Sequence, residues 1–336
     1  MRLTFLFVSA MINITQMDIP KMYERADGMS LFSGFTSLRE IFEKYNCGRE
    51  GFVNMQIGCN KQLYFLFNEK IPERIDGMFV PTNSDSRYCI IVLDIDWDNE
   101  AVIGERFYDL GTQKMNYHLV QPLNGGFLLV ASRCYCRNGI GENNAALFDK
   151  QGSIISQFCL GDGIEDVIVL SDGRIVTSYF DEGVFGNYGW DEPLGASGLV
   201  VWDKDGNIVW EADSDICDCY ALNIDNSERL WYYYYTEFEL VCTDLQKETV
   251  YRPDISGACM FILTADGQSV IFDKGYDDHG SFVKERFIDG RLSEPEDMLL
   301  DYYGGEISPW RYTSRGSLAA FIDNEYRLFV KDFIIV

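Results

Sequence analysis

The sequence predicts an all-β fold made of one four-stranded antiparallel unit that repeats along the chain. Three observations predict it: two Asp-Gly hairpins in succession, five weaker copies of the same pattern elsewhere in the chain, and the absence of a fourth strand from the last of these copies. The composition agrees, since aromatic residues make up 15% of the 336 residues and flat rings pack well on pleated sheets. We expect residues 1–336 to form a single domain because no linker rich in Pro, Ser or Gly interrupts the pattern.

The repeating unit is clearest between residues 163 and 212. The segments GIEDVIVLSDGRIVTSYFDEGVFG (163–186) and GLVVWDKDGNIVWEA (198–212) each contain two short apolar runs joined at an Asp-Gly dipeptide, Asp172-Gly173 or Asp205-Gly206. Such a dipeptide between apolar runs is a strong hairpin signal because both residues tolerate positive φ. Two hairpins in succession predict one four-stranded antiparallel sheet.

Five more copies of this pattern occur in the rest of the chain, two before this unit and three after it. They lie at 52–111 (VNMQIG, LYFLF, YCIIVLDIDW, AVIGERFYDL), 115–160 (MNYHLVQPL, GFLLVASR, AALFD, IISQFCL), 220–252 (YALNI, RLWYYYY, ELVCTDL, ETVYR), 259–294 (CMFILT, SVIFD, FVKERFI, RLSE) and 308–333 (SPWRYTS, SLAAFI, RLFVKDF). The first strands of the six copies begin near Val53, Tyr117, Val167, Cys219, Ala258 and Pro309. Most intervals are near the roughly 40 to 50 residues of one propeller blade, which predicts a six-bladed β-propeller.

The last copy has only three strands, and this predicts how the ring closes. A propeller is usually closed by a strand from one terminus that completes the blade begun at the other, because closure removes open sheet edges. The segment SLREIFEKY at 37–45 precedes the first copy and matches outer strands such as IISQFCL. We therefore predict that residues 37–46 form the closing strand and that residues 1–36 are a lead-in segment.

The turn chemistry and the period resemble those of the NHL and SMP30-like group of six-bladed propellers, and the resemblance covers most of the chain. The Trp-Asp dipeptide does not end each copy as it does in WD40 blades; it occurs at Trp97-Asp98, Trp190-Asp191 and Trp202-Asp203. SMP30-type lactonases bind a divalent metal in the central channel through Glu, Asn and Asp, so the resemblance implies a similar site here. Residues of these types near first-strand starts are Glu50, Asn54, Asn116, Glu165, Asp166 and Asp218, and no local motif selects among them.

The formal charge of −25 argues against nucleic acid and anionic membranes as partners. Binding to phosphates depends on Lys and Arg, and here 28 basic residues are outnumbered by 53 acidic ones. Cationic ligands, divalent metals and basic protein surfaces remain compatible with this charge. The alternative is that the acidic surface serves solubility alone.

The cysteines indicate reduced thiols in a cytoplasmic protein rather than a disulfide framework. Several lie within apolar runs, where a thiol serves as a small buried hydrophobe: Cys59, Cys89, Cys159, Cys242 and Cys259. The close pairs Cys134/Cys136 and Cys217/Cys219 have C-x-C spacing, which is a poor match to zinc ligands. Residues 1–14, MRLTFLFVSAMINI, are predicted as a strand; the alternative is a secretory signal segment, which would make the protein secreted.

The loops at one end of the predicted propeller are long, acidic and aromatic, which suggests a recognition surface. The alternative is that the rings only anchor the loops to the blades. The first strand of the copy at 115–160 contributes His118, one of the two histidines in the sequence. The candidate binding residues are Glu165, Asp166, Asp181, Glu182, Tyr188, Trp190, Asp218, Tyr135, Arg133 and His118.

Glu165, Asp166 and Asp218 are also the candidate metal ligands. If these carboxylates meet at the channel, crowding raises their pKa values or recruits a cation, and oxygen-only ligands suit calcium. No G-x-S-x-G elbow or phosphate-binding loop appears in the sequence. The sequence therefore predicts a module that binds a protein, peptide or carbohydrate through this face, with Ca²⁺ as the one candidate cofactor. The alternative is a metal-dependent hydrolase or lactonase with a carboxylate-lined channel.

Overall fold

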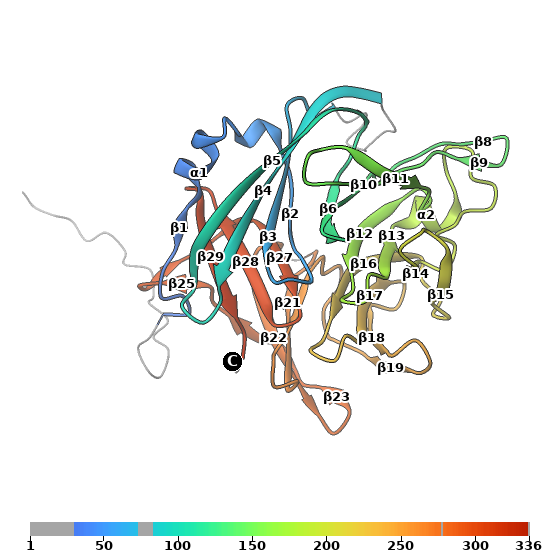
Figure 1. Cartoon of the computed structure of the whole chain (residues 1–336). Coiled ribbons are helices and arrows are strands. Elements are labelled where there is room, and N and C mark those ends of the chain that lie inside the picture. The colour runs from blue at the N-terminus through green and yellow to red at the C-terminus, as the bar shows by residue number, and fades with distance from the viewer. Residues whose placement is uncertain (1–29, 73–82, 277, 335–336) are drawn as a thin grey trace, which may run out of the picture.

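The computed structural model describes residues 30–72, 83–276 and 278–334. Strands make up 51% of the structure and helices 5%, so the fold is all-β as predicted. The lead-in residues 1–29, and with them the predicted strand at 1–14, lie outside the described residues. The described residues form a ring of six blades whose colours run in chain order around the molecule in Figure 1.

Each blade is an antiparallel sheet, numbered here from its first strand along the chain. Blade 1 holds β2 (Phe52–Ile57), β3 (Leu63–Asn68), β4 (Asn83–Asp96) and β5 (Ala101–Met115). Blade 2 holds β6 (Leu119–Leu123), β7 (Gly126–Val130), β10 (Ala145–Phe148) and β11 (Ile154–Phe158). Blade 3 holds β12 (Ile164–Val169), β13 (Ile175–Tyr179), β14 (Leu199–Trp202) and β15 (Ile208–Glu211).

The later blades follow the same order. Blade 4 holds β16 (Asp218–Ile224), β17 (Leu230–Tyr235), β18 (Glu239–Thr243) and β19 (Glu248–Tyr251). Blade 5 holds β20 (Phe261–Leu263), β21 (Ser269–Asp273) and β22 (Phe282–Ile288), which pairs with both β23 (Arg291–Leu292) and β24 (Glu296–Met298). Blade 6 holds β27 (Pro309–Arg315), β28 (Leu318–Asp323), β29 (Arg327–Asp332) and β1 (Thr36–Ser37). Outside the blades lie α1 (Leu38–Lys44), α2 (Asp181–Phe185), the 3-10 turn at Arg49–Gly51, and the hairpins β8 (Cys136–Arg137) with β9 (Ile140–Gly141) and β25 (Asp301–Tyr302) with β26 (Gly305–Glu306).

Closure by an N-terminal strand is confirmed, but most of the predicted closing strand is helical. Only β1 pairs with β29, with Thr36 opposite Leu328, and α1 follows at once. The prediction of a strand over 37–46 was wrong beyond Ser37 because the apolar residues Leu38, Ile41 and Phe42 have helical spacing and share one face. Leu38 and Phe42 are buried in the core cluster shared by blades 6 and 1. In Figure 1 the blue β1 and α1 lie beside the red strands of blade 6.

The core consists of six apolar clusters of described residues, one in each gap between neighbouring blades. Successive side chains of a strand point to opposite faces of its blade. Each face packs against a neighbouring blade, so the side chains on both faces are buried. In β12, Val167 and Val169 pack toward blade 2, whereas Ile168 packs toward blade 4. This explains why the strand segments are continuous apolar runs rather than alternating ones.

Side-chain amides satisfy backbone groups of the innermost strands around the channel. Gln56 Nε2 donates to Val167 O at 3.1 Å and Gln56 Oε1 accepts from Val120 N at 2.8 Å, which links blades 1, 2 and 3. Across the ring, Arg315 of blade 6 donates to Val169 O of blade 3 at 2.7 Å. Val169 and Arg315 are the last residues of their strands, so the channel is bridged at the end where the innermost strands finish.

Candidate functional site

The site lies where the innermost strands begin, at the end of the channel opposite Arg315. We call this the channel mouth; it comprises Glu165, Asp166, Asp181, Asp218, Cys259, Asp273, His279 and Tyr312. Each blade contributes here because every innermost strand starts at the same end of the ring. The loops between second and third strands, including α2 and the loop after β21, open on the same side.

A recurrent β-bulge directs side chains toward this end. Among the described residues, the pairing of the first two strands shifts register at the same early position in four blades. The extra residue is Val53 in blade 1, Glu165 in blade 3, Tyr220 in blade 4 and Trp310 in blade 6. A bulge re-aims a side chain that a regular strand would bury between blades. This explains how Glu165 is exposed within an otherwise buried strand.

Four carboxyl groups, those of Glu165, Asp166, Asp181 and Asp218, share the blade 3 and 4 side of the channel mouth. Burial raises the pKa of Asp218 to about 7, and the charges of Glu165 and Asp181 raise it further, against a hydrogen bond from the Asp181 N–H. Desolvation also raises the pKa of Asp166 to about 7 and that of Glu165 above its ordinary value, since the Glu165 side chain is open to the channel but surrounded by the blades. Each shift means that the charged carboxylate is poorly compensated, so a bound cation would stabilise this group of acids.

Aromatic side chains stand beside these acids. The aromatic rim comprises Tyr220, Tyr235, Phe238 and Tyr276, with Tyr220 stacked near Tyr235 at a centroid distance of 6.4 Å and the Tyr220 and Tyr276 hydroxyls hydrogen-bonded. Tyr235 and Tyr276 are 41% and 61% exposed, which leaves ring surface free for a ligand. The rim was not predicted from the sequence, because Tyr220 reaches it through the bulge and Tyr276 through a loop of the next blade.

The structure thus places Glu165, Asp166, Asp181 and Asp218 at the same end of the channel, and it places other candidates elsewhere. Arg133 is buried; its guanidinium pairs with Asp162 at 3.0 Å and with Glu182, and lies 4.3 Å from the Tyr188 ring centroid. Tyr135 packs edge-on against Tyr188 at 5.2 Å. These residues form a cluster apart from the channel mouth, between the loops of blades 2 and 3, and this cluster holds the two loops together.

Trp190 and His118 also have internal partners. Trp190 is 8% exposed and its Nε1 donates to Cys134 O at 3.0 Å, so the ring anchors the β13–β14 loop to blade 2. His118 Nδ1 accepts from Ser132 N at 3.1 Å. For these two side chains the geometry favours anchoring over ligand contact.

A second polar cluster at the channel mouth was missed by sequence reasoning. Cys259 is exposed rather than buried in an apolar run, so its interpretation as a buried hydrophobe was wrong. Asp273 is fully buried and accepts hydrogen bonds from Cys259 N at 2.9 Å, Tyr312 Oη at 2.9 Å and His279 Nδ1 at 2.7 Å. Although the residue is exposed, its thiol lies against Asp273 and Tyr312, and the resulting desolvation raises the pKa of Cys259 to about 12. The charge of Asp273 also raises this pKa, which argues against a thiolate nucleophile.

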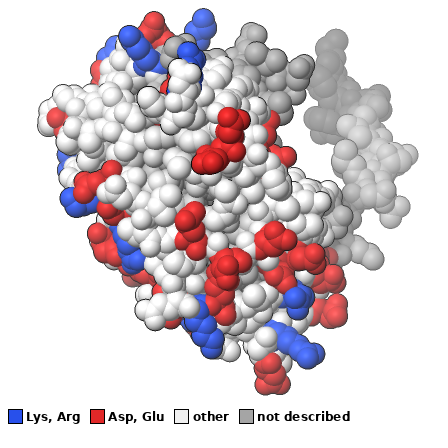
Figure 2. Space-filling view, turned by 90° about the vertical axis from the view of Figure 1, so that its right-hand side faces the viewer, with Lys and Arg blue, Asp and Glu red and all other residues white. Residues whose placement is uncertain are grey.

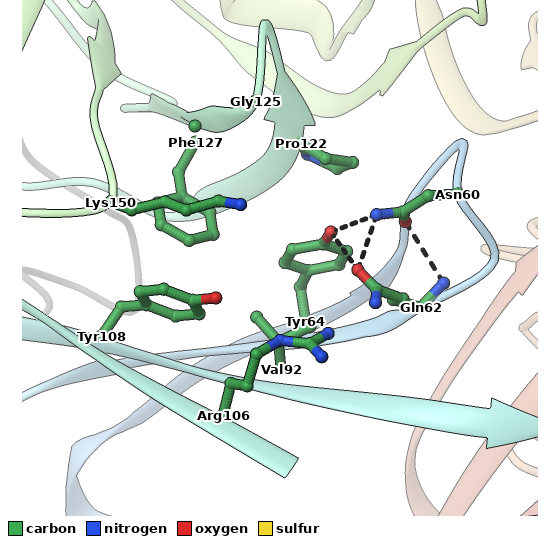
Figure 3. A pocket seen from close by; sticks show the side chains of 11 residues that line it. Asn60, Gln62, Tyr64, Val92, Arg106, Tyr108, Pro122, Gly125, Phe127 and Lys150 are labelled. Atoms are coloured by element: carbon green, nitrogen blue, oxygen red, sulfur yellow. Dashed lines mark hydrogen bonds between the residues drawn. The ribbon is translucent and has the colours of Figure 1, made fainter. Parts of the chain in front are cut away.

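One cavity lies apart from the channel mouth, near the turns where the innermost strands of blades 1 and 2 end. It holds about 380 Å³, and Figure 3 shows Tyr64, Arg106, Tyr108 and Lys150 around it. Arg106 is already paired with Asp94, at 2.7 and 2.8 Å. The cavity contains none of the candidate residues predicted from the sequence.

The excess of acidic side chains is also seen on the molecular surface. Figure 2, which views the side of the molecule that carries β15 in Figure 1, shows acidic side chains spread over that face among uncharged areas. Within the described part of the chain, helices are too short or too polar to cross a membrane.

Comparisons with known proteins define the fold and no more. The sequence matches no family model and no curated protein. Hydrazine synthase from Kuenenia stuttgartiensis is similar in structure, with a TM-score of 0.50 and 11% identity over 84% of this chain and 77% of that one. Virginiamycin B lyase from Staphylococcus aureus gives 0.47 and 11% over 84% and 95%, and the WD40 propeller domain of Doa1 gives 0.48 and 11% over 84% and 79%. At such identities the likeness concerns the backbone fold alone. The protein is a six-bladed β-propeller.

Proposed function

We propose that this propeller is a recognition module that binds a cationic segment of a protein or peptide partner at the channel mouth. The observation that carries the proposal is the placement of Asp218, with the Glu165 carboxylate near it, beside the exposed rings of the aromatic rim. Carboxylates pair with Lys and Arg, and aromatic faces bind the same cations through cation–π contact. One Arg side chain of the partner would pair with a carboxylate and contact an aromatic ring at the same time.

The energies favour a charged ligand over a neutral one. A guanidinium about 4 Å from one carboxylate gains roughly 4 kcal/mol at an effective dielectric constant near 20, before the loss of its own hydration. Contact with an exposed ring adds roughly 0.5–1 kcal/mol. The net charge of −25 would speed the approach of a basic partner at low salt. A neutral saccharide would gain from the rings only.

The test is a fluorescence anisotropy titration with a labelled Arg-rich peptide and with the same peptide carrying citrulline, which is neutral, in place of Arg. The double variant Glu165→Gln/Asp218→Asn should bind the Arg peptide at least about 10-fold more weakly than wild type, since two close charge partners are lost. The control Asp172→Asn removes one exposed charge in the β12–β13 turn, at the other end of blade 3, and should stay within about twofold. Equal binding of the Arg and citrulline peptides, or an unchanged affinity in the double variant, would contradict the proposal.

A further inference from the structure

The second polar cluster at the channel mouth has the donor set of a metal site. Its residues come from three parts of blade 5 that the fold brings together: Cys259 just before β20, Asp273 at the end of β21 and His279 in the loop that follows. Tyr312 approaches from the innermost strand of blade 6. One atom of each of the first three residues lies within 4.8 Å of the others.

The distances between these atoms fit a small ion with tetrahedral geometry. Cys259 Sγ lies 3.2 Å from Asp273 Oδ2 and 3.8 Å from His279 Nδ1, and these last two atoms are 2.7 Å apart. Zinc bonds of about 2.3 Å to sulfur and about 2.1 Å to nitrogen and oxygen place tetrahedral ligands roughly 3.4 to 3.6 Å apart. Both sulfur distances are close to this range. The third requires His279 to move by roughly 0.7 Å, which its half-exposed side chain on a loop permits.

The surroundings position the ligands as outer partners do in metal sites. Asp273 Oδ1 accepts from Cys259 N at 2.9 Å, which fixes the carboxylate and leaves Oδ2 for the ion. Tyr312 Oη lies 2.9 Å from Asp273 Oδ2 and 3.4 Å from Cys259 Sγ, so it can support both ligands. The His279 side chain is 52% exposed, which gives an ion a path from solvent.

We propose that Cys259, Asp273 and His279 bind a zinc ion, with the fourth position left to water or to the Tyr312 hydroxyl. Thiolate and imidazole donors select zinc over calcium and magnesium, which take oxygen ligands. On binding, the Cys259 thiol gives its proton to solvent and its sulfur pair to the ion. The proton that His279 Nδ1 donates to Asp273 in the free protein moves to Nε2 by exchange with solvent, so that Nδ1 can coordinate. This site is separate from the carboxylates of the proposed function and does not depend on it.

The experiment titrates chelator-treated, reduced protein with Zn²⁺ against a chromophoric competitor and, in parallel, with Co²⁺. Cobalt in a thiolate site gives a charge-transfer absorption in the near ultraviolet that a carboxylate site does not give. We expect one zinc per chain and this absorption in wild type. Cys259→Ser and His279→Gln should each weaken zinc binding by more than about 100-fold, and Tyr312→Phe by about 10-fold or more.

Two matched controls make the result specific. Cys217→Ser removes a half-buried thiol near the same end of the ring, hydrogen-bonded to Thr236 rather than to the cluster, and should leave zinc binding and the cobalt absorption unchanged. Glu165→Gln/Asp218→Asn removes no ligand, so it should keep the cobalt absorption and the binding of one zinc per chain, with a smaller change in zinc affinity than either ligand substitution. If Cys259→Ser does not fold, His279→Gln carries the test because its side chain is half exposed. Absence of the cobalt absorption in wild type, or zinc binding that persists in His279→Gln but is lost in Glu165→Gln/Asp218→Asn, would overturn the proposal.

Discussion

Replacing Glu285 by Gln should stabilise the protein at alkaline pH. Glu285 lies in β22 with no exposed surface; Oε1 accepts from Asp254 N at 3.1 Å, whereas Oε2 is buried without a hydrogen-bond partner among the described residues. Burial raises the pKa of this carboxyl from 4.5 to about 7. Gln keeps the shape and the Oε1 acceptor but carries no charge. The variant therefore isolates the effect of ionising a buried acid.

The sign and size follow from proton linkage. The folded pKa lies above the unfolded one, so the unfolded state ionises first as pH rises and the free energy of unfolding falls between about pH 4.5 and 7. The full shift corresponds to about 3 kcal/mol, of which about 2.5 kcal/mol develops between pH 5 and 8. Below pH 4.5 the group has no effect, and above pH 7 the destabilisation is constant.

Urea unfolding of wild type and Glu285→Gln at pH 5 and pH 8 measures this directly. The stability of the variant relative to wild type should rise by about 2 to 3 kcal/mol from pH 5 to pH 8. Asp289→Asn, at an exposed acid on the same blade, is the control, and its stability relative to wild type should change by less than about 0.5 kcal/mol between the two pH values. A difference between Glu285→Gln and wild type that does not change with pH would refute the reasoning.

Two further predictions concern the architecture. Deleting residues 1–46 removes β1 and α1, which opens an edge of blade 6 and exposes apolar core; the deleted protein should aggregate, as light scattering would show, and a soluble, cooperatively melting product would contradict closure. Arg133→Ala leaves the buried Asp162 unpaired and should lower the unfolding free energy by about 3 to 5 kcal/mol. The exposed Arg137→Ala, whose partner is 3.9 Å away, should lower it by less than about 1 kcal/mol, and equal effects of the two changes would contradict this role for Arg133.

The fold was predictable because its signals are local. Asp-Gly turns, apolar runs and a fixed period each depend on a few neighbouring residues, and together they gave the six blades and the closure from the N-terminus. The helix α1 shows the limit of comparing segments by apolar content: SLREIFEKY resembles an outer strand in composition, but the spacing of Leu38, Ile41 and Phe42 is helical. Period decides between the two structures, and composition does not.

The site was predictable only where topology alone brings residues together. Glu165 and Asp218 meet because innermost strands begin at the same end of every propeller blade. Cys259, Asp273 and His279 follow at intervals of 14 and 6 residues without a motif, and their meeting depends on where β21 ends and how its loop folds back. The pairing of Arg133 with Asp162 depends likewise on which loops touch, and single-sequence patterns carry no signal for that.

The pH dependence of Arg-peptide affinity tests the central claim most directly. The pKa values of Asp166 and Asp218 are raised to about 7, and a cation among these carboxylates would favour their charged forms, so binding should release protons. The account predicts that affinity rises several-fold from pH 6 to pH 8 in wild type and rises clearly less in Glu165→Gln/Asp218→Asn, where Asp166 alone of these two aspartates still titrates near pH 7. A wild-type affinity that is independent of pH over this range, or that falls, would contradict a cation-binding channel mouth.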